Sequence, residues 1–144
     1  MRPLVVTVVA SAALVLGAAV AQASPAIPLN TGQESDQVTG GGNGSFSYTI
    51  DGAELCYVLS VHNLSASSVA AHIHVAPRGV AGPVVVPLAT PPAATSSVSE
   101  CLTAVEGGVM TPAELAAIVA DPGAHYVNVH TPAHPGGEVR GQLK

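Results

Sequence analysis

The sequence predicts an all-β domain, an antiparallel β-sandwich or Greek-key-like barrel with one short helix. Several short segments alternate polar and apolar residues, and turn-forming residues separate them at intervals of about 8–12 residues, the spacing of an all-β fold. A single segment carries the start signals and the apolar spacing of a helix. Because strand side chains at i and i+2 share a face, the alternation predicts a sheet with one apolar and one polar face.

The expected strands follow one another along most of the chain. The run 46–50 alternates aromatic or aliphatic residues with Ser and Thr, and Asp51-Gly52 supplies a hairpin turn before the β-rich run 55–61. Five further runs are rich in β-forming residues: 69–75, 84–88, 96–103, 126–131 and 137–143. The run 84–88 is expected at a sheet edge, because Pro87 lacks the backbone N–H that a central strand needs.

The segment Thr111-Pro112-Ala113-Glu114 begins the expected helix. Thr is a good N-cap, Pro is favoured at the first helical position, and Glu at the third completes a capping box. The residues that follow place one apolar stripe at helical spacing: Leu115, Ile118 and Val119. Asp121-Pro122-Gly123 ends the helix after two or three turns. A helix this short is marginal alone, so we expect it to pack on the sheet.

The first 23 residues have the composition of a secretory signal peptide. Arg2 gives a positively charged start, residues 4–20 are apolar, and Ala21-Gln22-Ala23 fits the cleavage pattern. Cleavage there leaves residues 24–144 as a single secreted, extracytoplasmic domain. Its first part, residues 24–44, is rich in Gly, Pro, Ser and Thr and is expected to end in a flexible turn or linker.

Charge and hydropathy exclude two classes of partner. Without Arg2 the chain carries a net charge of −6, since three basic residues oppose nine acidic ones. It has no basic patch for nucleic acid or for an anionic membrane surface. Past the signal peptide, no segment has the roughly 20 apolar residues that span a bilayer. The expected partner is an extracellular molecule that the sequence does not identify.

Cys56 and Cys101 are the two cysteines of the chain. An even count in an exported protein favours a disulfide, and the chain lacks the Cys-x-x-Cys spacing of redox and metal sites. A bond between the two closes a loop of about 45 residues. The sequence leaves open the alternative of two separate buried thiols.

Polar side chains gather on one face of three expected strands. The i and i+2 rule groups them as His72 with His74, then Tyr126, Asn128 and His130, then Glu138, Arg140 and Gln142. Each strand turns its other residues to the opposite face, so one sheet would bring these side chains together. Two interpretations follow, a metal site and a structural network.

His72, His74 and His130 are the candidate metal ligands. Two histidines separated by one residue on a strand can reach the same ion, and a third joins them if its strand lies alongside. Three imidazoles suit copper or zinc, and binding is expected to weaken as the pH falls through about 6.5, where an ordinary imidazole protonates. We expect the other histidines to be surface or turn residues: His62, His125 and His134.

The alternative is a structural role for the same face. Asn128, Glu138 and Arg140 can satisfy backbone groups and hold loops, because buried polar groups need partners whatever the function. We expect Glu138 or Arg140, or both, to be buried and paired. Nucleophilic catalysis has little support, since the chain has no Gly-x-Ser-x-Gly elbow and no glycine-rich phosphate loop before a helix. An enzyme is the less favoured class.

Four segments together resemble the CHRD domain, the module named after chordin: Ala71-His72-Ile73-His74, residues 79–85, residues 126–131 and residues 135–143. The resemblance covers about residues 29–143. It implies a secreted β-sandwich module of immunoglobulin-like or superoxide-dismutase-like topology, usually without a defined biochemical activity. The chain departs from the family at Gln33-Glu34-Ser35-Asp36, where an acidic-Pro-Pro pattern is usual.

The polar face is also similar to that of copper/zinc superoxide dismutases. His72 and His74 match a pair of copper ligands in that family, and His130 matches a later one. Arg140 resembles the arginine that attracts the anionic substrate. The chain has no histidine between Val75 and Ala124, so the bridging ligand and the zinc ligands of that family are missing. The resemblance therefore implies a fold and a copper site, and argues against dismutase activity.

The sequence thus predicts a secreted CHRD-type module with a non-catalytic extracytoplasmic role in binding or structure. The alternative is a copper- or zinc-binding protein with a three-histidine site and a capacity for redox chemistry. The first interpretation requires no cofactor, and the second requires the ion. Geometry separates them first, because the second holds only if the three rings converge.

Overall fold

The structure, a computed structural model, describes residues 25–144, and the predicted signal peptide lies outside them. The described residues form eight strands, one α-helix and two short 3-10 helices. In chain order they are β1 (Ile27–Asn30), η1 (Thr31–Gln33), β2 (Asn43–Asp51), β3 (Glu54–His62), β4 (Ala70–Val75), β5 (Val84–Leu88), β6 (Ser96–Thr103), α1 (Pro112–Ala120), η2 (Pro122–Ala124), β7 (His125–Thr131) and β8 (His134–Gln142).

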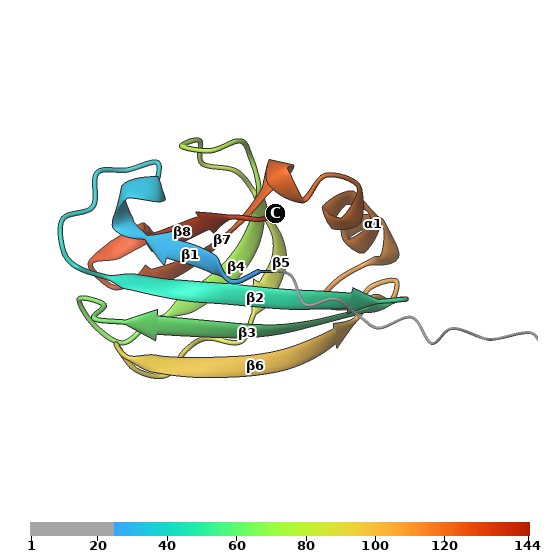
Figure 1. Ribbon diagram of the computed structural model, residues 1–144, viewed down its shortest axis with the longest axis horizontal. Helices are drawn as coiled ribbons and strands as arrows, with labels where there is room; N and C mark the ends of the chain where they lie inside the picture. The colour runs from blue at the N-terminus through green and yellow to red at the C-terminus, as the bar shows by residue number, and fades with distance from the viewer. Residues whose placement is uncertain (1–24) are drawn as a thin grey trace, which may run out of the picture.

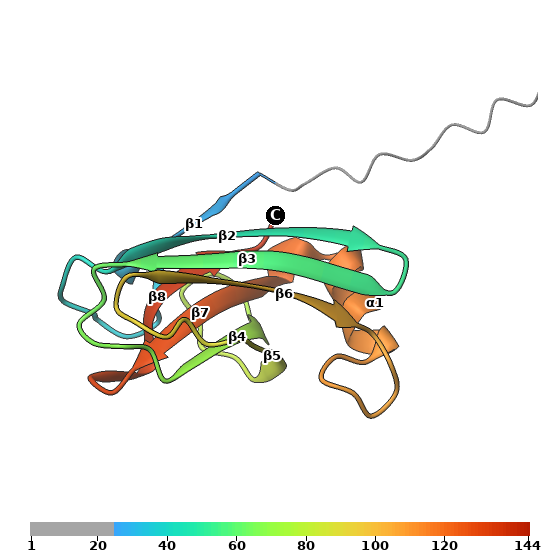
Figure 2. The ribbon, with the colours of Figure 1, turned by 90° about the horizontal axis from the view of Figure 1, so that it is seen from below.

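The strands form one antiparallel sheet in the order β5-β4-β7-β8-β1-β2-β3-β6. The sheet curls into two layers, β5-β4-β7-β8 and β1-β2-β3-β6, which Figure 1 and Figure 2 show from two sides. The layers join where β1 meets β8, through one registered pair, Asn30 with Arg140. The predicted all-β antiparallel fold is confirmed, and the short helix is α1.

The apolar side of each strand faces the space between the layers. One layer contributes residues such as Ile73 and Val127, and the other contributes residues such as Phe46 and Leu59, all fully buried in one hydrophobic cluster. Burying side chains of this size contributes roughly 1.5–3 kcal/mol each. The period-2 alternation of the sequence is therefore what sets the fold.

Several predicted strand boundaries match the structure. The runs 84–88 and 96–103 are β5 and β6 at their full length. β5 lies at one edge of the sheet, as the missing N–H of Pro87 predicts, and β6 lies at the other edge. The Asp51-Gly52 turn also joins β2 to β3, and Gly52 has the positive φ that such a hairpin needs.

Two of the differences from the prediction have a clear local cause. Residues 27–30 form β1 within the segment expected to be irregular. Ile27 and Leu29 are buried and alternate with exposed residues, but the Pro at 28 and the surrounding Gly-, Pro- and Ser-rich residues hide the strand in the sequence. β8 begins at His134, since Thr131 pairs with His134 across a two-residue turn. Pro135, Gly136 and Gly137 therefore lie in a strand although their residue types are typical of a turn. A register shift between Val129 and Thr131 accommodates the extra length.

The helix α1 begins as its capping residues predict. Thr111 accepts a hydrogen bond from the Glu114 backbone N–H, and the Glu114 carboxylate accepts from the Thr111 backbone N–H at 2.7 Å. Leu115 and Ile118 are buried against the core, but Val119 is 58 % exposed, so the expected three-residue stripe is wrong at Val119. The helix presents a narrower face because it packs on one end of the sandwich (Figure 1).

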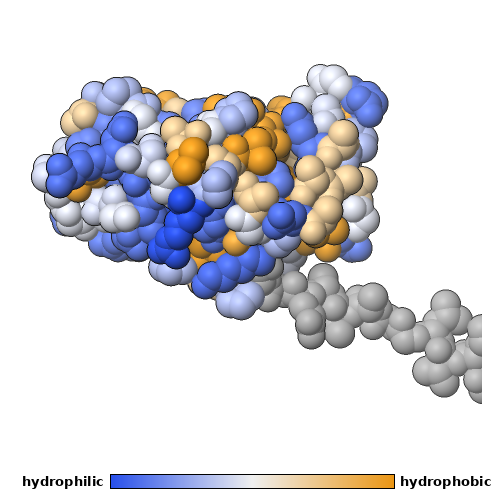
Figure 3. Space-filling model, turned by 90° about the horizontal axis from the view of Figure 1, so that it is seen from above, coloured by the Kyte–Doolittle hydropathy of each residue, from blue (hydrophilic) through white to orange (hydrophobic). Residues whose placement is uncertain are grey.

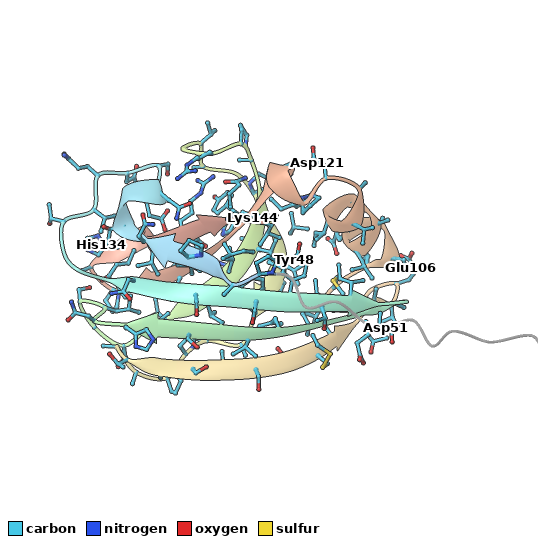
Figure 4. The ribbon with its side chains drawn as sticks, viewed as in Figure 1. Tyr48, Asp51, Glu106, Asp121, His134 and Lys144 are labelled. Carbon is cyan, nitrogen blue, oxygen red and sulfur yellow. A yellow bond between two sulfur atoms is a disulfide. The ribbon has the colours of Figure 1, made fainter. Side chains whose placement is uncertain are left out.

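A disulfide joins Cys56 of β3 to Cys101 of β6, as predicted. The two residues are direct partners in the register of the pair, so the bond ties the edge strand to its neighbour. Figure 4 shows the sulfur–sulfur bond on the outer side of that layer. Within residues 25–144, none of the helices has the length and hydropathy to span a membrane.

Candidate metal centre

The candidate site lies on the outer face of the β4-β7-β8 layer. Register places His72, Asn128 and Arg140 side by side, one from each strand. Residues 31–36 pack against β8 on this side, and residues 76–83 are hydrogen-bonded to Arg140. Every side chain of β7 is buried as a result. Both faces of this layer are therefore covered at β7: one packs on the hydrophobic core, and the other carries buried polar side chains.

The three predicted ligands His72, His74 and His130 come together on this face. β4 pairs with β7 so that Ala70 lies opposite His130, which brings the third histidine beside the other two. One ligand nitrogen from each ring lies within 4.8 Å of the other two, and His72 Nδ1 lies 3.1 Å from His130 Nε2. Nitrogens bonded to one ion at about 2.0–2.1 Å lie roughly 3–4 Å apart. The His72–His130 pair already has that spacing, and an ion would draw the three nitrogens closer than the 4.8 Å limit of the cluster.

Backbone carbonyls fix the proton on two of the rings. His74 Nδ1 donates to the Gly82 carbonyl over 2.9 Å. His130 Nδ1 donates to the Pro135 carbonyl, also over 2.9 Å. A carbonyl can only accept, so in the neutral ring the lone pair is on Nε2. Metal-ligating histidines are typically oriented through this kind of bond at the far nitrogen. The geometry presents His74 Nε2 and His130 Nε2 as ligand atoms.

The electrostatics keep these rings neutral. Burial, reinforced by the neighbouring His130 and His74 rings, lowers the pKa of His72 to about 4. Burial also lowers the pKa of His74 and the pKa of His130. A neutral imidazole retains the lone pair that a metal ion needs. His74 Nε2 is buried and has no hydrogen-bond partner within the described residues, so this donor set fits an ion.

Tyr126 lies between His74 and Arg140 in a stacked column. The Tyr126 ring is 4.8 Å from the His74 ring with an interplanar angle of 6°. The Arg140 guanidinium carbon lies 3.3 Å from the centre of the Tyr126 ring, a cation–π contact. The Tyr126 hydroxyl accepts a hydrogen bond from the Gly82 backbone N–H at 3.1 Å. The column fixes the plane of the His74 ring and holds the 76–83 loop over it.

Arg140 is 1 % exposed and directs its donors at backbone carbonyls. Nη1 donates to the Val80 carbonyl over 2.8 Å, and Nη2 donates to the Pro77 carbonyl over 3.0 Å. At the same loop, a Cβ on Gly82 would come 2.0 Å from the Val75 carbonyl oxygen, so this position accepts only glycine. Arg140 and Gly82 together set the path of the loop beside the histidines.

Glu138 lies in a separate part of the polar face. One of its oxygens accepts from the Ser65 N–H at 2.7 Å, and the other accepts from the Ser65 and Thr131 hydroxyls at 2.6 Å each. Burial opposes ionisation, but these hydrogen bonds outweigh it and lower the pKa of the Glu138 carboxyl. Glu138 thereby ties the segment before β4 to β7 and β8. Ser65 has no sequence signal that would have linked it to Glu138.

The other three histidines divide between surface and interior. His62 is exposed at the end of β3, as expected. His134 is half-buried beside the β7–β8 turn, at the opposite end of the molecule from Asp51 (Figure 4). The expectation that His125 is a surface or turn residue is wrong, because it begins strand β7 and is 3 % exposed. Its Nδ1 donates to the Asp121 carbonyl at 2.9 Å, which satisfies the buried ring at the start of β7.

Glu34 is a member of the polar face that the sequence does not predict. Burial raises the pKa of its carboxyl to about 7, against the lowering effect of the Arg140 charge and with a smaller contribution from Asp36. A Cβ on Gly137 would lie 2.4 Å from Glu34 Oε1, so the carboxyl packs directly on the β8 backbone. Glu34 falls in a Gly- and Ser-rich segment, where nothing in the residue pattern marks it as covered.

A second group of metal-type side chains, Glu54 with Cys56 and Cys101, is not a candidate site. Both sulfurs are held in the disulfide. Among the described residues, this leaves the histidine cluster as the group of three metal-type side chains whose ligand atoms are not held in a covalent bond.

Comparison with protein families gives one match. The family described as the CHRD domain matches residues 26–143, nearly all of the described chain. No curated protein and no solved structure matches the sequence. The matched range contains all three histidines and the whole polar face.

Proposed function

The chain belongs to the CHRD domain family, and we propose that it is a secreted binding module whose ligand is a copper or zinc ion held by His72, His74 and His130. The observation that carries the proposal is the convergence of three imidazoles, with the unpartnered, buried His74 Nε2 among them. Two of the rings already have the far-side hydrogen bonds of metal ligands. Export is supported by the signal-type N-terminus and by the disulfide.

The surroundings of the cluster favour binding over catalysis. Arg140 is bonded to the Pro77 and Val80 carbonyls and covered by them. It therefore does not offer a free guanidinium to an anionic substrate, which is the role implied by the resemblance to superoxide dismutases.

On the molecular face of Figure 3, hydrophobic residues lie in separate clusters divided by hydrophilic ones. Scattered apolar residues of this kind do not mark a large protein interface.

The donor set selects among metals. Three neutral nitrogens suit Cu²⁺ and Zn²⁺. For a given nitrogen site the divalent affinity order places copper above zinc. We therefore expect Cu²⁺ to displace Zn²⁺ when both are supplied.

Metal analysis of the exported protein, purified without a histidine tag, tests the proposal. We expect close to one copper or zinc ion per chain. His72→Ala should weaken binding by more than the roughly 10–100-fold that loss of a supporting residue produces. His62→Ala is the matched control, because His62 is exposed on the other layer and should leave binding unchanged. A parent protein that takes up no copper or zinc in titration overturns the proposal.

The pH dependence gives a second readout. An ordinary imidazole protonates near pH 6.5, but the pKa of His72 is lowered to about 4 and those of His74 and His130 are also lowered. Protons therefore compete with the metal only at lower pH. We expect the ion to be retained at pH values where an unfolded His-rich peptide has already released it. Release that coincides with the peptide's would mean that these rings are not held neutral.

A further inference from the structure

Four buried side-chain atoms in the described residues have no hydrogen-bond partner, and all belong to the polar face: Glu34 Oε1, His74 Nε2, Asn128 Oδ1 and Arg140 Nε. Two of them are complementary, since Arg140 Nε is a donor and Glu34 Oε1 is an acceptor of opposite charge. The other two are both acceptors, because the neutral His74 ring carries its proton on Nδ1. Two buried acceptors that face each other require an electropositive group between them, either a proton on the His74 ring or a metal ion.

We propose that the amide oxygen of Asn128 is a fourth ligand of the ion held by the three histidines, an inference that rests on the proposed function. Asn128 lies opposite His72 in the β4–β7 register and is two residues from His130 on β7. It is 1 % exposed, so its oxygen has no access to bulk water. Its side chain lies close enough to the His74 ring to accept a hydrogen bond from that ring when it is protonated, which places the amide oxygen next to His74. One residue thus borders all three ligands.

The amide orientation is fixed by its nitrogen. Asn128 Nδ2 donates to the Gly136 carbonyl over 3.4 Å. Turning the amide over would set two oxygens against each other at that position. A Cβ on Gly137 would come 2.7 Å from Nδ2, so the strand backbone packs on the nitrogen side. The nitrogen is held by β8, and the oxygen is left for the histidine side.

A fourth ligand changes the kind of site. Sites with four protein ligands are typical of structural or stored ions, whereas catalytic sites keep a position open for water or substrate. Three imidazole nitrogens and one amide oxygen form a neutral set that suits divalent copper or zinc better than soft, monovalent copper. The inference therefore assigns the module a closed site for a divalent ion.

The test compares Cu²⁺ affinity and the electron paramagnetic resonance spectrum of four proteins: the parent, Asn128→Leu, Asn128→Asp and Thr131→Val. Asn128→Leu keeps the shape and removes the oxygen. Asn128→Asp keeps the shape and makes the oxygen anionic. Thr131→Val is the matched control. Thr131 lies on β7, as Asn128 does, and the substitution removes a buried hydrogen bond to Glu138 without altering the metal donor set.

We expect Asn128→Leu to bind Cu²⁺ at least about tenfold more weakly, with altered copper hyperfine splitting. We expect Asn128→Asp to bind at least about tenfold more tightly, because an anionic oxygen attracts a divalent cation. Thr131→Val should show the parent affinity and spectrum although it is less stable. If Asn128→Leu does not fold, the Asn128→Asp affinity and spectrum decide.

Parental affinity and spectra in both Asn128 variants would overturn the fourth ligand and leave the three-histidine site intact. A parent that binds no ion would overturn the proposed function itself, so the two failures are distinct. A doubly protonated His74 in the metal-free protein at neutral pH, seen by nitrogen NMR, would also overturn the inference. In that case Asn128 Oδ1 would be the acceptor for a ring proton.

Discussion

The two layers of the sheet turn very different polar faces outward, although both follow the same alternation. On the β2-β3-β6 layer most outward residues are small, among them Ser45, Ser47, Thr49, Ser60, Ser97 and Ser99, and they surround the disulfide and the exposed Val58. Those on the edge strand β6 are exposed or half-exposed. On the β4-β7-β8 layer they are large and rich in donors, and every one on β7 is buried under loops.

The difference shows what side-chain size implies about a polar face. A serine on the exposed face of a strand is satisfied by water or by a neighbouring serine, as Ser60 and Ser97 are, so nothing needs to cover it. Arg140 and Asn128 have several donors and acceptors in fixed geometry, and the loop carbonyls of residues 76–83 and the backbone of β8 accept three hydrogen bonds from them. Large polar residues at alternating positions therefore indicate a covered face, and that is where this domain concentrates its chemistry.

The largest expected effect is Arg140→Ala on the covered face. Removing two buried, charge-assisted hydrogen bonds leaves the Pro77 and Val80 carbonyls without donors, so we expect a loss of about 3–5 kcal/mol in the free energy of unfolding. Arg78→Ala, in the exposed part of the same loop, should change it by less than about 0.5 kcal/mol. Urea denaturation measures both. Equal losses for Arg140→Ala and Arg78→Ala would mean that Arg140 is solvated as Arg78 is, and that the polar face of the β4-β7-β8 layer is not covered.

The next largest effect is expected on the outer face of the β2-β3-β6 layer, where the disulfide is the main constraint. Replacing both Cys56 and Cys101 by Ala should lower the free energy of unfolding by at most about 4 kcal/mol, from the closure entropy of a loop of 45 residues. The same denaturation experiment measures it, and reduction of the parent should reproduce it. Two free thiols in a non-reducing peptide map would remove this prediction.

Glu138→Gln should have a smaller effect, about 2–3 kcal/mol, because it replaces a carboxylate that accepts three hydrogen bonds. The folded pKa of Glu138 is lowered from 4.5, so the stabilisation is present above that pH and is lost as the pH falls through the folded pKa. The difference between parent and variant should therefore shrink in acid. Glu100→Gln, on the exposed edge strand, keeps an acceptor for the Tyr57 hydroxyl, which donates to Glu100 over 2.8 Å, and should cost less than about 1 kcal/mol. A pH-independent difference would contradict the carboxylate's role.

The smallest effect is expected for Ser99→Ala, at the exposed outer face of β6. A solvated serine contributes little, so the free energy of unfolding should change by less than about 0.5 kcal/mol. Thr131→Val, which loses a buried bond to Glu138, should cost about 1–2 kcal/mol by contrast. A larger loss for Ser99 than for Thr131 would reverse the comparison between the faces.

The sequence predicts those parts of the molecule that depend on local pattern. Alternation and β-rich runs locate β2 to β7, the capping residues locate α1, and the i and i+2 rule groups His72 with His74 and His130 with Asn128. The sequence does not predict β1, because its four residues include Pro28 and lie in a Gly-, Pro- and Ser-rich segment. The structure brings His130 beside His72 and His74, but strand pairing decides this, and pairing is a property of the whole sheet.

What covers the site also lies beyond local pattern. Glu34 and Gly82 sit in loops, and the sequence does not state which strand a loop crosses. His125 is tolerated in the interior because the Asp121 carbonyl, just before η2, accepts a hydrogen bond from its ring, and this contact has no sequence signature. The prediction that Val119 packs on the sheet is wrong for the converse reason, since a helix at the end of a sandwich has less surface to pack against.

The burial of β7 on both faces has a consequence for how the domain can be observed. A strand with paired neighbours on each side and covered side chains exposes its amides only when the whole domain unfolds. Its amide hydrogens should therefore be among the slowest to exchange with solvent. In protein produced in deuterated medium, the signals of residues 125–131 would stay dark until the chain is unfolded and refolded in ordinary water. The strand that carries Asn128 and His130 thus keeps an isotopic record of the solvent in which it folded.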